Sequence, residues 1–274
     1  MFSIESRVRT MDSFISGLEQ DLSRGLNIAG FRALLAVQDN VISTGVFLED
    51  YREDIKEVVI NGSLNGEELG IASDSSISDW VDRINIESKK INLIIDYKIN
   101  SLEVSHSSPW EVNVGMNITF FIKDTNNVAS WTTEDVINAS VSILGFEDPF
   151  YIVNTFAKDT RIISKTNTSV WGIDKLKDHL NQKTYKAYTG APSFLMRLEG
   201  DTSSSQYGIE TLVDTNKLSE LEIPVKSASS VDYIYWSDAP TQNYKIDEIT
   251  DEFMPGFKLD SDHVNEFNVG NYTY

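Results

Sequence analysis

The chain has 274 residues, of which 41% are hydrophobic and 11% aromatic; this suits one large folded domain or two smaller ones and argues against wholesale disorder. Its 42 acidic and 23 basic residues give a net charge of −19, so its surface repels nucleic-acid phosphates and anionic membrane faces. Cysteine is absent, which excludes disulfides, thiolate nucleophiles and zinc–sulfur sites.

The N-terminal segment carries a heptad-like apolar stripe. Its members are spaced alternately by four and three residues, and they are Ile4, Val8, Met11, Ile15, Leu18 and Leu22. Polar residues fall between them, which predicts an amphipathic helix over residues 3–24. Gly25 and Gly30 weaken the pattern, although apolar residues continue as far as Val41. Two interpretations stay open: the stripe packs on the protein's own domain, or it forms a stalk or an oligomer seam.

Two further helices are expected before the pattern changes. Apolar residues recur at helical spacing over residues 46–59, and a loop rich in Gly, Ser and Asn follows over residues 61–76. Ser78 or Asp79 is expected to cap the third helix, which ends near Ile91.

From residue 92 apolar residues recur at every second position, which is typical of strands with one buried and one solvent-exposed face. Strands are predicted over residues 92–99, 111–123 and 137–143. Their close spacing favours antiparallel hairpins and a sandwich over a doubly wound nucleotide-binding fold.

The chain beyond Pro149 has a mixed pattern. Helices are predicted over residues 173–180, 192–198 and 261–267, and strands over residues 184–188 and 231–236. The predicted fold class is therefore α+β, with N-terminal amphipathic helices followed by an antiparallel, β-sandwich-like, β-rich head. The expected division is a helical region over residues 1–92 and a head over residues 93–274, packed together as one unit.

The sequence contains no recognisable catalytic motif. His106, His179 and His263 lack metal-ligand spacing, and there is no nucleophile elbow, P-loop or dinucleotide fingerprint. We therefore predict no catalytic residue and no cofactor. Paired carboxylates are common in so acidic a chain, which leaves a carboxylate-dependent hydrolase as the second alternative function.

Two sets of residues could bind ligands at a surface. The densest acidic cluster, which offers oxygen ligands for calcium but lacks the calcium-loop pattern, consists of Asp247, Glu248, Asp251 and Glu252, with Asp260 and Asp262 as a weaker pair. Aromatic residues that could stack on a sugar are Trp131, Trp171, Tyr233 and Tyr235. The plainer interpretations are a solvated acidic face and a buried aromatic core.

Five Asn-x-Ser/Thr sequons are candidate glycosylation sites, at Asn61, Asn117, Asn138, Asn167 and Asn271. Asn117 and Asn138 fall on the polar faces of predicted strands, and Asn61 falls in a predicted loop. We expect these three to be open to modification if the protein is exported.

Three strings carry a family resemblance: GFEDPFYIVNT at residues 145–155, GAPSFLMRLEG at residues 190–200 and YGIE at residues 207–210. In these strings and in the order of its segments, most of the chain resembles uncharacterised archaeal type IV pilin-like, membrane-anchored cell-surface proteins. The strings are not catalytic motifs, so the resemblance carries no catalytic residue.

The resemblance implies an N-terminal membrane helix that continues into the amphipathic helix and an external β-rich head. This sequence lacks the apolar membrane segment, so we expect it to be the exported part of such a protein, with the stripe after Ile4 as the outer half of a pilin-type helix. The implied function is a non-enzymatic, extracellular structural or adhesion protein, anchored in its full-length form, whose partners are other surface or pilus subunits, including copies of itself. The first alternative is a carbohydrate- or calcium-binding surface module.

Overall fold

A computed structural model describes residues 4–127, 129–237 and 240–274, with the side chain of Ile4 outside the description. The chain forms two compact units. Unit 1 comprises Met1–Asn40 and Asp50–Ser142, and unit 2 comprises Val41–Glu49 and Ile143–Tyr274. Helices and antiparallel sheets occur together, which confirms the α+β class. The division differs from the predicted boundary after residue 92, because the long strands pack with the helices that precede them.

The N-terminal helix α1 (Ile4–Thr44) is continuous through both glycines. A Cβ atom on Gly25 would lie 3.0 Å from the Trp80 indole, and one on Gly30 would lie 3.2 Å from a methyl group of Val114. The glycines therefore let the helix approach its neighbours closely, and this contact offsets their weak helix propensity.

Two shorter helices complete the helical part of unit 1. Helix α2 (Tyr51–Asn61) begins at Asp50, whose carboxylate accepts hydrogen bonds from the first-turn amides. Helix α3 (Ile77–Lys90) begins with a reciprocal capping box between Ser76 and Asp79, two residues before the expected cap at Ser78.

The loop predicted between these helices contains a small hairpin. Its strands are β1 (Ser63–Leu64) and β2 (Glu67–Glu68). None of the described helices in the chain combines the length and the hydropathy that a bilayer span requires.

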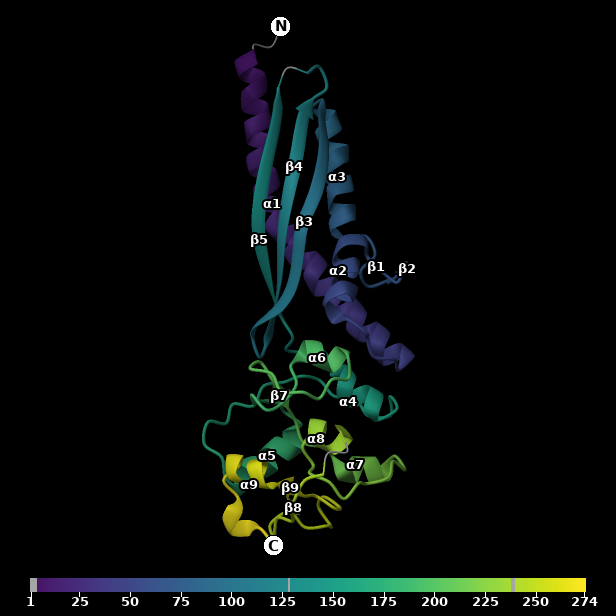
Figure 1. The fold of residues 1–274 in the computed structure, drawn as a ribbon, viewed down its shortest axis with the longest axis vertical. Coiled ribbons are helices and arrows are strands. Elements are labelled where there is room, and N and C mark those ends of the chain that lie inside the picture. The colour runs from purple at the N-terminus through teal and green to yellow at the C-terminus, as the bar shows by residue number, and fades with distance from the viewer. Residues whose placement is uncertain (1–3, 128, 238–239) are drawn as a thin grey trace. The chain divides into compact units, whose positions relative to one another are not determined.

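Three long antiparallel strands form the main sheet of unit 1, in the order β3 (Leu93–Ser108), β4 (Glu111–Asp124) and β5 (Ser130–Ser142). On β4 the even-numbered side chains from Val112 to Ile122 are buried, and the odd-numbered ones are more exposed. Helices α1 and α3 run along the same side of the sheet (Figure 1), where Trp80 of α3 packs against Phe120. A sandwich of two sheets is not confirmed, since helices supply the second layer.

Unit 2 is built from short elements joined by loops. Its helices are α4 (Pro149–Asn154), α5 (Ile173–Gln182), α6 (Phe194–Leu198), α7 (Thr215–Glu220), α8 (Asp232–Ser237), α9 (Ser261–Glu266) and the 3-10 turn η1 (Gly270–Tyr272). Two antiparallel pairs consist of β6 (Lys186–Ala187) with β7 (Ile209–Glu210), and β8 (Asn243–Tyr244) with β9 (Leu259–Asp260). The described strand content is thus concentrated in unit 1.

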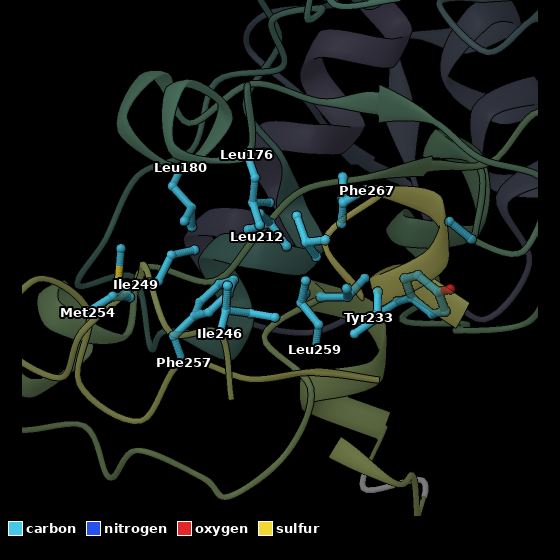
Figure 2. Packing of buried hydrophobic residues seen from close by; sticks show 14 of the residues in the cluster. Leu176, Leu180, Leu212, Tyr233, Ile246, Ile249, Met254, Phe257, Leu259 and Phe267 are labelled. Carbon is cyan, nitrogen blue, oxygen red and sulfur yellow. The ribbon is translucent and has the colours of Figure 1, made fainter. Parts of the chain in front are cut away.

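A hydrophobic core holds these short elements together. Figure 2 shows side chains from α5, the segment between β7 and α7, α8 and the C-terminal part of the chain converging on it. Those labelled are Leu176, Leu180, Leu212, Tyr233, Ile246, Ile249, Met254, Phe257, Leu259 and Phe267. A smaller cluster gathers around the buried Tyr151 and Tyr235.

The strand predicted over residues 231–236 is wrong, because this segment forms α8. The amide of Tyr235 donates to the carbonyl of Val231 at 2.8 Å, which closes one helical turn. Val231 and Tyr235 are buried, and Ile234 and Trp236 are half-buried. A short segment that is covered on nearly every side shows no face for periodicity to identify.

Candidate functional site

The heptad stripe of α1 is covered within unit 1. Met11, Ile15, Leu18 and Leu22 are buried and Val8 is half-buried, while the side chain of Ile4 lies outside the described residues. Contacts on either side of this segment tie α1 to the sheet: Arg7 forms an ion pair with Asp124, and the side-chain amide of Asn27 donates to the carbonyl of Ser140. In this structure the stripe packs on the protein's own domain.

Another face of α1 carries an apolar ridge that we call the α1 ridge, formed by Ile28, Phe31 and Leu35. Ile28 is 46% exposed, Phe31 is 43% exposed and Leu35 is half-buried. Their spacing of three and four residues puts them on one helix face, which Arg24 and Arg32 also share. The sequence pattern does not separate this ridge, because the apolar residues as far as Val41 read as a continuation of the heptad-like stripe.

The five sequons lie at positions of unequal accessibility. Asn61, at the end of α2, and Asn138, Asn167 and Asn271 are exposed, whereas Asn117 is half-buried on the central strand β4. The predicted loop position of Asn61 is corrected to a helix end.

The side-chain amide of Asn117 is already bonded on both sides. Its Nδ2 donates to Glu134 at 2.9 Å, and its Oδ1 accepts from Asn100 at 2.8 Å. A glycan attached at Nδ2 would have to replace the bond to Glu134. Asn138, on β5, makes one weak contact at 3.4 Å with the amide of Asn113.

The proposed calcium ligands do not gather around one point. Asp247, Glu248, Asp251 and Glu252 are all exposed. Glu248 pairs with Lys177 at 2.9 Å and Asp251 with Lys245 at 3.1 Å. Across the described ranges, no group of three or more His, Cys, Asp or Glu residues is placed to hold a metal ion.

Two of the four proposed stacking aromatics belong to the core. Tyr235 is buried and its hydroxyl accepts from the amide of Lys226, and Tyr233 is only 9% exposed. Trp131 and Trp171 are half-buried. The two tyrosines are therefore not available as exposed stacking surfaces.

A buried ion cluster, which we call the Arg197 centre, joins the starts of two helices to α6. Arg197, Asp148 and Asp232 have no exposed side-chain surface. The Arg197 guanidinium donates to Asp148 at 2.7 Å, lies 2.7 Å from an oxygen of Asp232 and donates to the Ile209 carbonyl at 2.5 Å. Tyr185 donates its hydroxyl to Asp148 at 2.6 Å.

Electrostatics in the Arg197 centre reflect its burial. Burial raises the pKa of the Asp232 carboxyl to about 6, against the opposing attraction of Arg197. A raised carboxyl pKa is also what a hydrolase acid needs, but Asp232 is fully buried and ion-paired to Arg197. The centre therefore has the character of a structural tie between α4, α6 and α8.

A second cluster, the His263 centre, lies between β7 and α9. His263 places Nε2 3.0 Å from Glu210 and Nδ1 2.8 Å from Asp260, and Ser229 donates to Asp260 at 2.7 Å. Lys186 lies 3.4 Å from Glu210. All five side chains are buried.

The titration of the His263 centre follows from these bonds. Burial favours neutral His263, but its hydrogen bonds to Asp260 and Glu210 and their charges raise its pKa to about 9. Burial likewise disfavours the Asp260 anion, yet the bonds from His263 and Ser229 lower its pKa to about 2. In a catalytic triad the hydroxyl bonds to a neutral imidazole, whereas here Ser229 bonds to the carboxylate and the imidazole is protonated. The geometry is that of a buried network of ion pairs that holds β7 and α9 together.

The strings that carry the family resemblance supply much of these centres. Asp148, Arg197 and Glu210 each lie in one of the three strings. Nothing in their local spacing indicates that they converge, because each partner comes from a different loop or helix.

Comparison with known proteins gave no match to a family model, a curated protein or a solved structure.

Proposed function

We propose that this chain is the exported part of a membrane-anchored, pilin-like cell-surface protein with a non-enzymatic structural or adhesion role. The observation that carries the proposal is the long helix α1, whose apolar stripe lies on one face of an antiparallel sheet within unit 1. The resemblance implies an amphipathic helix that leads into an external β-rich head, and a long helix packed on an antiparallel sheet supports that proposal. The sandwich-like head of the original expectation is replaced in the proposal by this helix-backed sheet.

The assembly surface in this proposal is the α1 ridge. Exposed apolar side chains in a row, flanked by arginines, are suited to pack on another subunit and to pair with its carboxylates. A second copy of this strongly acidic chain supplies such carboxylates, so self-assembly is the expected use.

Two pairs of substitutions on the same helix separate folding from assembly. Ile15→Ser with Leu18→Ser should destabilise unit 1, because each removal of a buried aliphatic side chain costs about 2–5 kcal/mol. Ile28→Ser with Phe31→Ser should destabilise unit 1 less than the buried pair does, because 46% and 43% of these side chains are exposed, but should abolish assembly of the full-length protein on cells.

The matched control for the ridge is Ile86→Ser, at an isoleucine of α3 that is 59% exposed. Assembly would be measured by electron microscopy and by crosslinking of surface subunits. Normal assembly of the ridge variant, or an equal loss in the Ile86 control, would reject the ridge as the assembly surface.

The anchored, surface location has its own test. The intact mass and detergent requirement of the protein isolated from its native membrane would be compared with those of this chain. The proposal expects a heavier, glycan-bearing native form that needs detergent. A freely soluble, unmodified form of the same mass would refute it.

A carbohydrate-binding surface module is the second candidate function. It is favoured by one specific feature, a polar cavity beside α5, which lies in unit 2 and is independent of the α1 ridge.

A further inference from the structure

Lys186 and Glu210 lie directly opposite each other on the paired strands β6 and β7. The Nζ atom of Lys186 is 3.4 Å from Oε1 of Glu210, and the two residues are only 7% and 1% exposed. The Cβ atoms of directly opposed residues are about 5 Å apart, so two side chains of this length can bring their ends together. The fold therefore holds an amine against a carboxyl group out of bulk water.

The Lys186 amine lies among aromatic rings and beside one further carboxylate. Its Nζ is 4.6 Å from the centre of the Tyr188 ring, 5.5 Å from that of Phe267 and 6.0 Å from that of Trp171. These rings keep water away but attract the ammonium form, so a base is needed to free the amine. Glu266, whose carboxylate is 2.7 Å from Nζ, is placed to take this proton.

The other oxygen of Glu210 faces an imidazolium. Nε2 of His263 lies 3.0 Å from Oε2 of Glu210, and Nδ1 of the same ring is held by Asp260 at 2.8 Å. Burial favours the neutral ring, but its hydrogen bonds to Asp260 and Glu210 raise the pKa of His263 to about 9, so the ring is protonated at neutral pH. A cation at Oε2 stabilises the negative charge that develops on this oxygen when a nucleophile adds to the carboxyl carbon.

Two physical effects favour a covalent bond over the ion pair of Lys186 and Glu210. Buried ions lose their hydration, whereas an amide formed from the same two groups carries no charge. Well-oriented groups that a fold holds in contact also react as if their concentration were about 10⁵–10⁸ M. After such a reaction His263 keeps its ion pair with Asp260, and Glu266 is 40% exposed, so no fully buried charge would lose its partner.

We propose that Lys186 and Glu210 form an isopeptide bond, an amide between Nζ and Cδ whose formation releases one molecule of water. Glu266 takes a proton from the ammonium, and the freed amine attacks Cδ of Glu210. His263 stabilises the negative charge on Oε2, which remains as the amide oxygen. The bond between Cδ and Oε1 then breaks. Of the three protons on Nζ, one stays on the amide nitrogen and two leave with Oε1 as water, one of them by way of Glu266.

The bond would tie β6 to β7 covalently and would enclose residues 187–209, which include α6. The chain has no cysteine, so a disulfide cannot supply such a link. A crosslink within unit 2 depends neither on the α1 ridge nor on a membrane anchor. It can therefore be present or absent whatever the outcome of the tests of assembly and location.

The test is the intact mass of the purified chain under denaturing conditions. After incubation of the folded protein at neutral pH, we expect a mass lower by one water molecule than the sequence requires. Trypsin should then release a branched peptide that joins residues 184–197 to residues 198–217, because an acylated Lys186 is no longer a cleavage site. A chain of full sequence mass, or a loss of water carried by other peptides, would overturn the proposal.

Three variants test the roles of the individual groups. Lys186→Arg keeps the positive charge but lacks the attacking amine, so it should have the full mass of its own sequence. When chain recovered in unfolded form is refolded, His263→Gln should slow the appearance of the branched peptide by about 100-fold, because it removes the cation at Oε2. The control is His179→Gln, at a second buried histidine of unit 2, which bonds to Thr184 and should leave the rate nearly unchanged.

A loss of water in Lys186→Arg, or equal rates in the two histidine variants, would also overturn the proposal. The mass of the unaltered chain gives a decisive result even where a variant does not fold.

Discussion

Replacing Arg197 by Met tests whether the Arg197 centre holds unit 2 together. Met has a similar length and no charge, so the change removes the guanidinium while keeping much of the packing. It leaves the Asp148 and Asp232 carboxylates buried without their cation, and it leaves the Ile209 carbonyl without the guanidinium hydrogen bond. Because all three ionic side chains are fully buried, the expected loss in the free energy of unfolding is about 3–5 kcal/mol.

The effect should depend on pH in a defined direction. Burial already raises the pKa of the Asp232 carboxyl above its unfolded value of about 4, and without the opposing attraction of Arg197 this pKa rises further. The destabilising contribution of the Asp232 carboxylate is then present at neutral pH and is relieved as the pH falls and this carboxyl takes up a proton. The deficit relative to the wild type should therefore be smaller at pH 5 than at pH 8.

Urea titration combined with hydrogen exchange of peptides from residues 143–274 would measure the stability of unit 2 separately from that of unit 1. The control is Lys217→Met, which removes a half-exposed ion pair with Glu220 in the same unit and should cost about 0–1 kcal/mol. If Arg197→Met costs no more than the control, or the same at both pH values, the centre is not a buried ionic tie.

Three further predictions concern single sites. His263 should contribute about 3 kcal/mol to the free energy of unfolding, and this contribution should be complete below its unfolded pKa of about 6.5 and lost as the pH rises through about 9. In urea titrations at a series of pH values, His263→Phe should remove this loss of stability at alkaline pH. Gly208→Ala should cost about 1–3 kcal/mol, because its Cβ would lie 2.1 Å from a backbone carbonyl oxygen, whereas Gly172→Ala, which meets nothing within 4 Å, should leave the melting temperature nearly unchanged. Glycopeptide mass spectrometry of the native protein should find higher occupancy at Asn138 than at Asn117, and the reverse order would contradict the hydrogen bonding of the sheet face.

The regular elements of unit 1 were largely predictable from local patterns. Alternation over residues 111–123 indicated β4 almost to the residue, because a strand with one buried face repeats every two positions. The stripe from Met11 to Leu22 indicated the buried side of α1 for the equivalent reason at helical spacing.

The extent of α1 was not predictable in the same way. Gly25 lowers helix propensity when the sequence is considered alone, yet in the fold its missing Cβ makes room for Trp80, a residue 55 positions away. The helix at residues 232–237 was missed because burial on most sides erased the periodicity that distinguishes helix from strand.

The sequence by itself thus determined the classes of site that the composition excludes, the α+β class, the apolar period of each long element and the positions of the sequons. Only the tertiary structure decided which side chains meet. Arg197 and Asp232 are 35 residues apart in the sequence, and Glu210 and His263, which meet in the His263 centre, are 53 residues apart. Ion pairs and cavities depend on distances between segments, and the packing of the whole unit sets these distances. A periodic apolar face, by contrast, depends only on residues that are close together in the sequence.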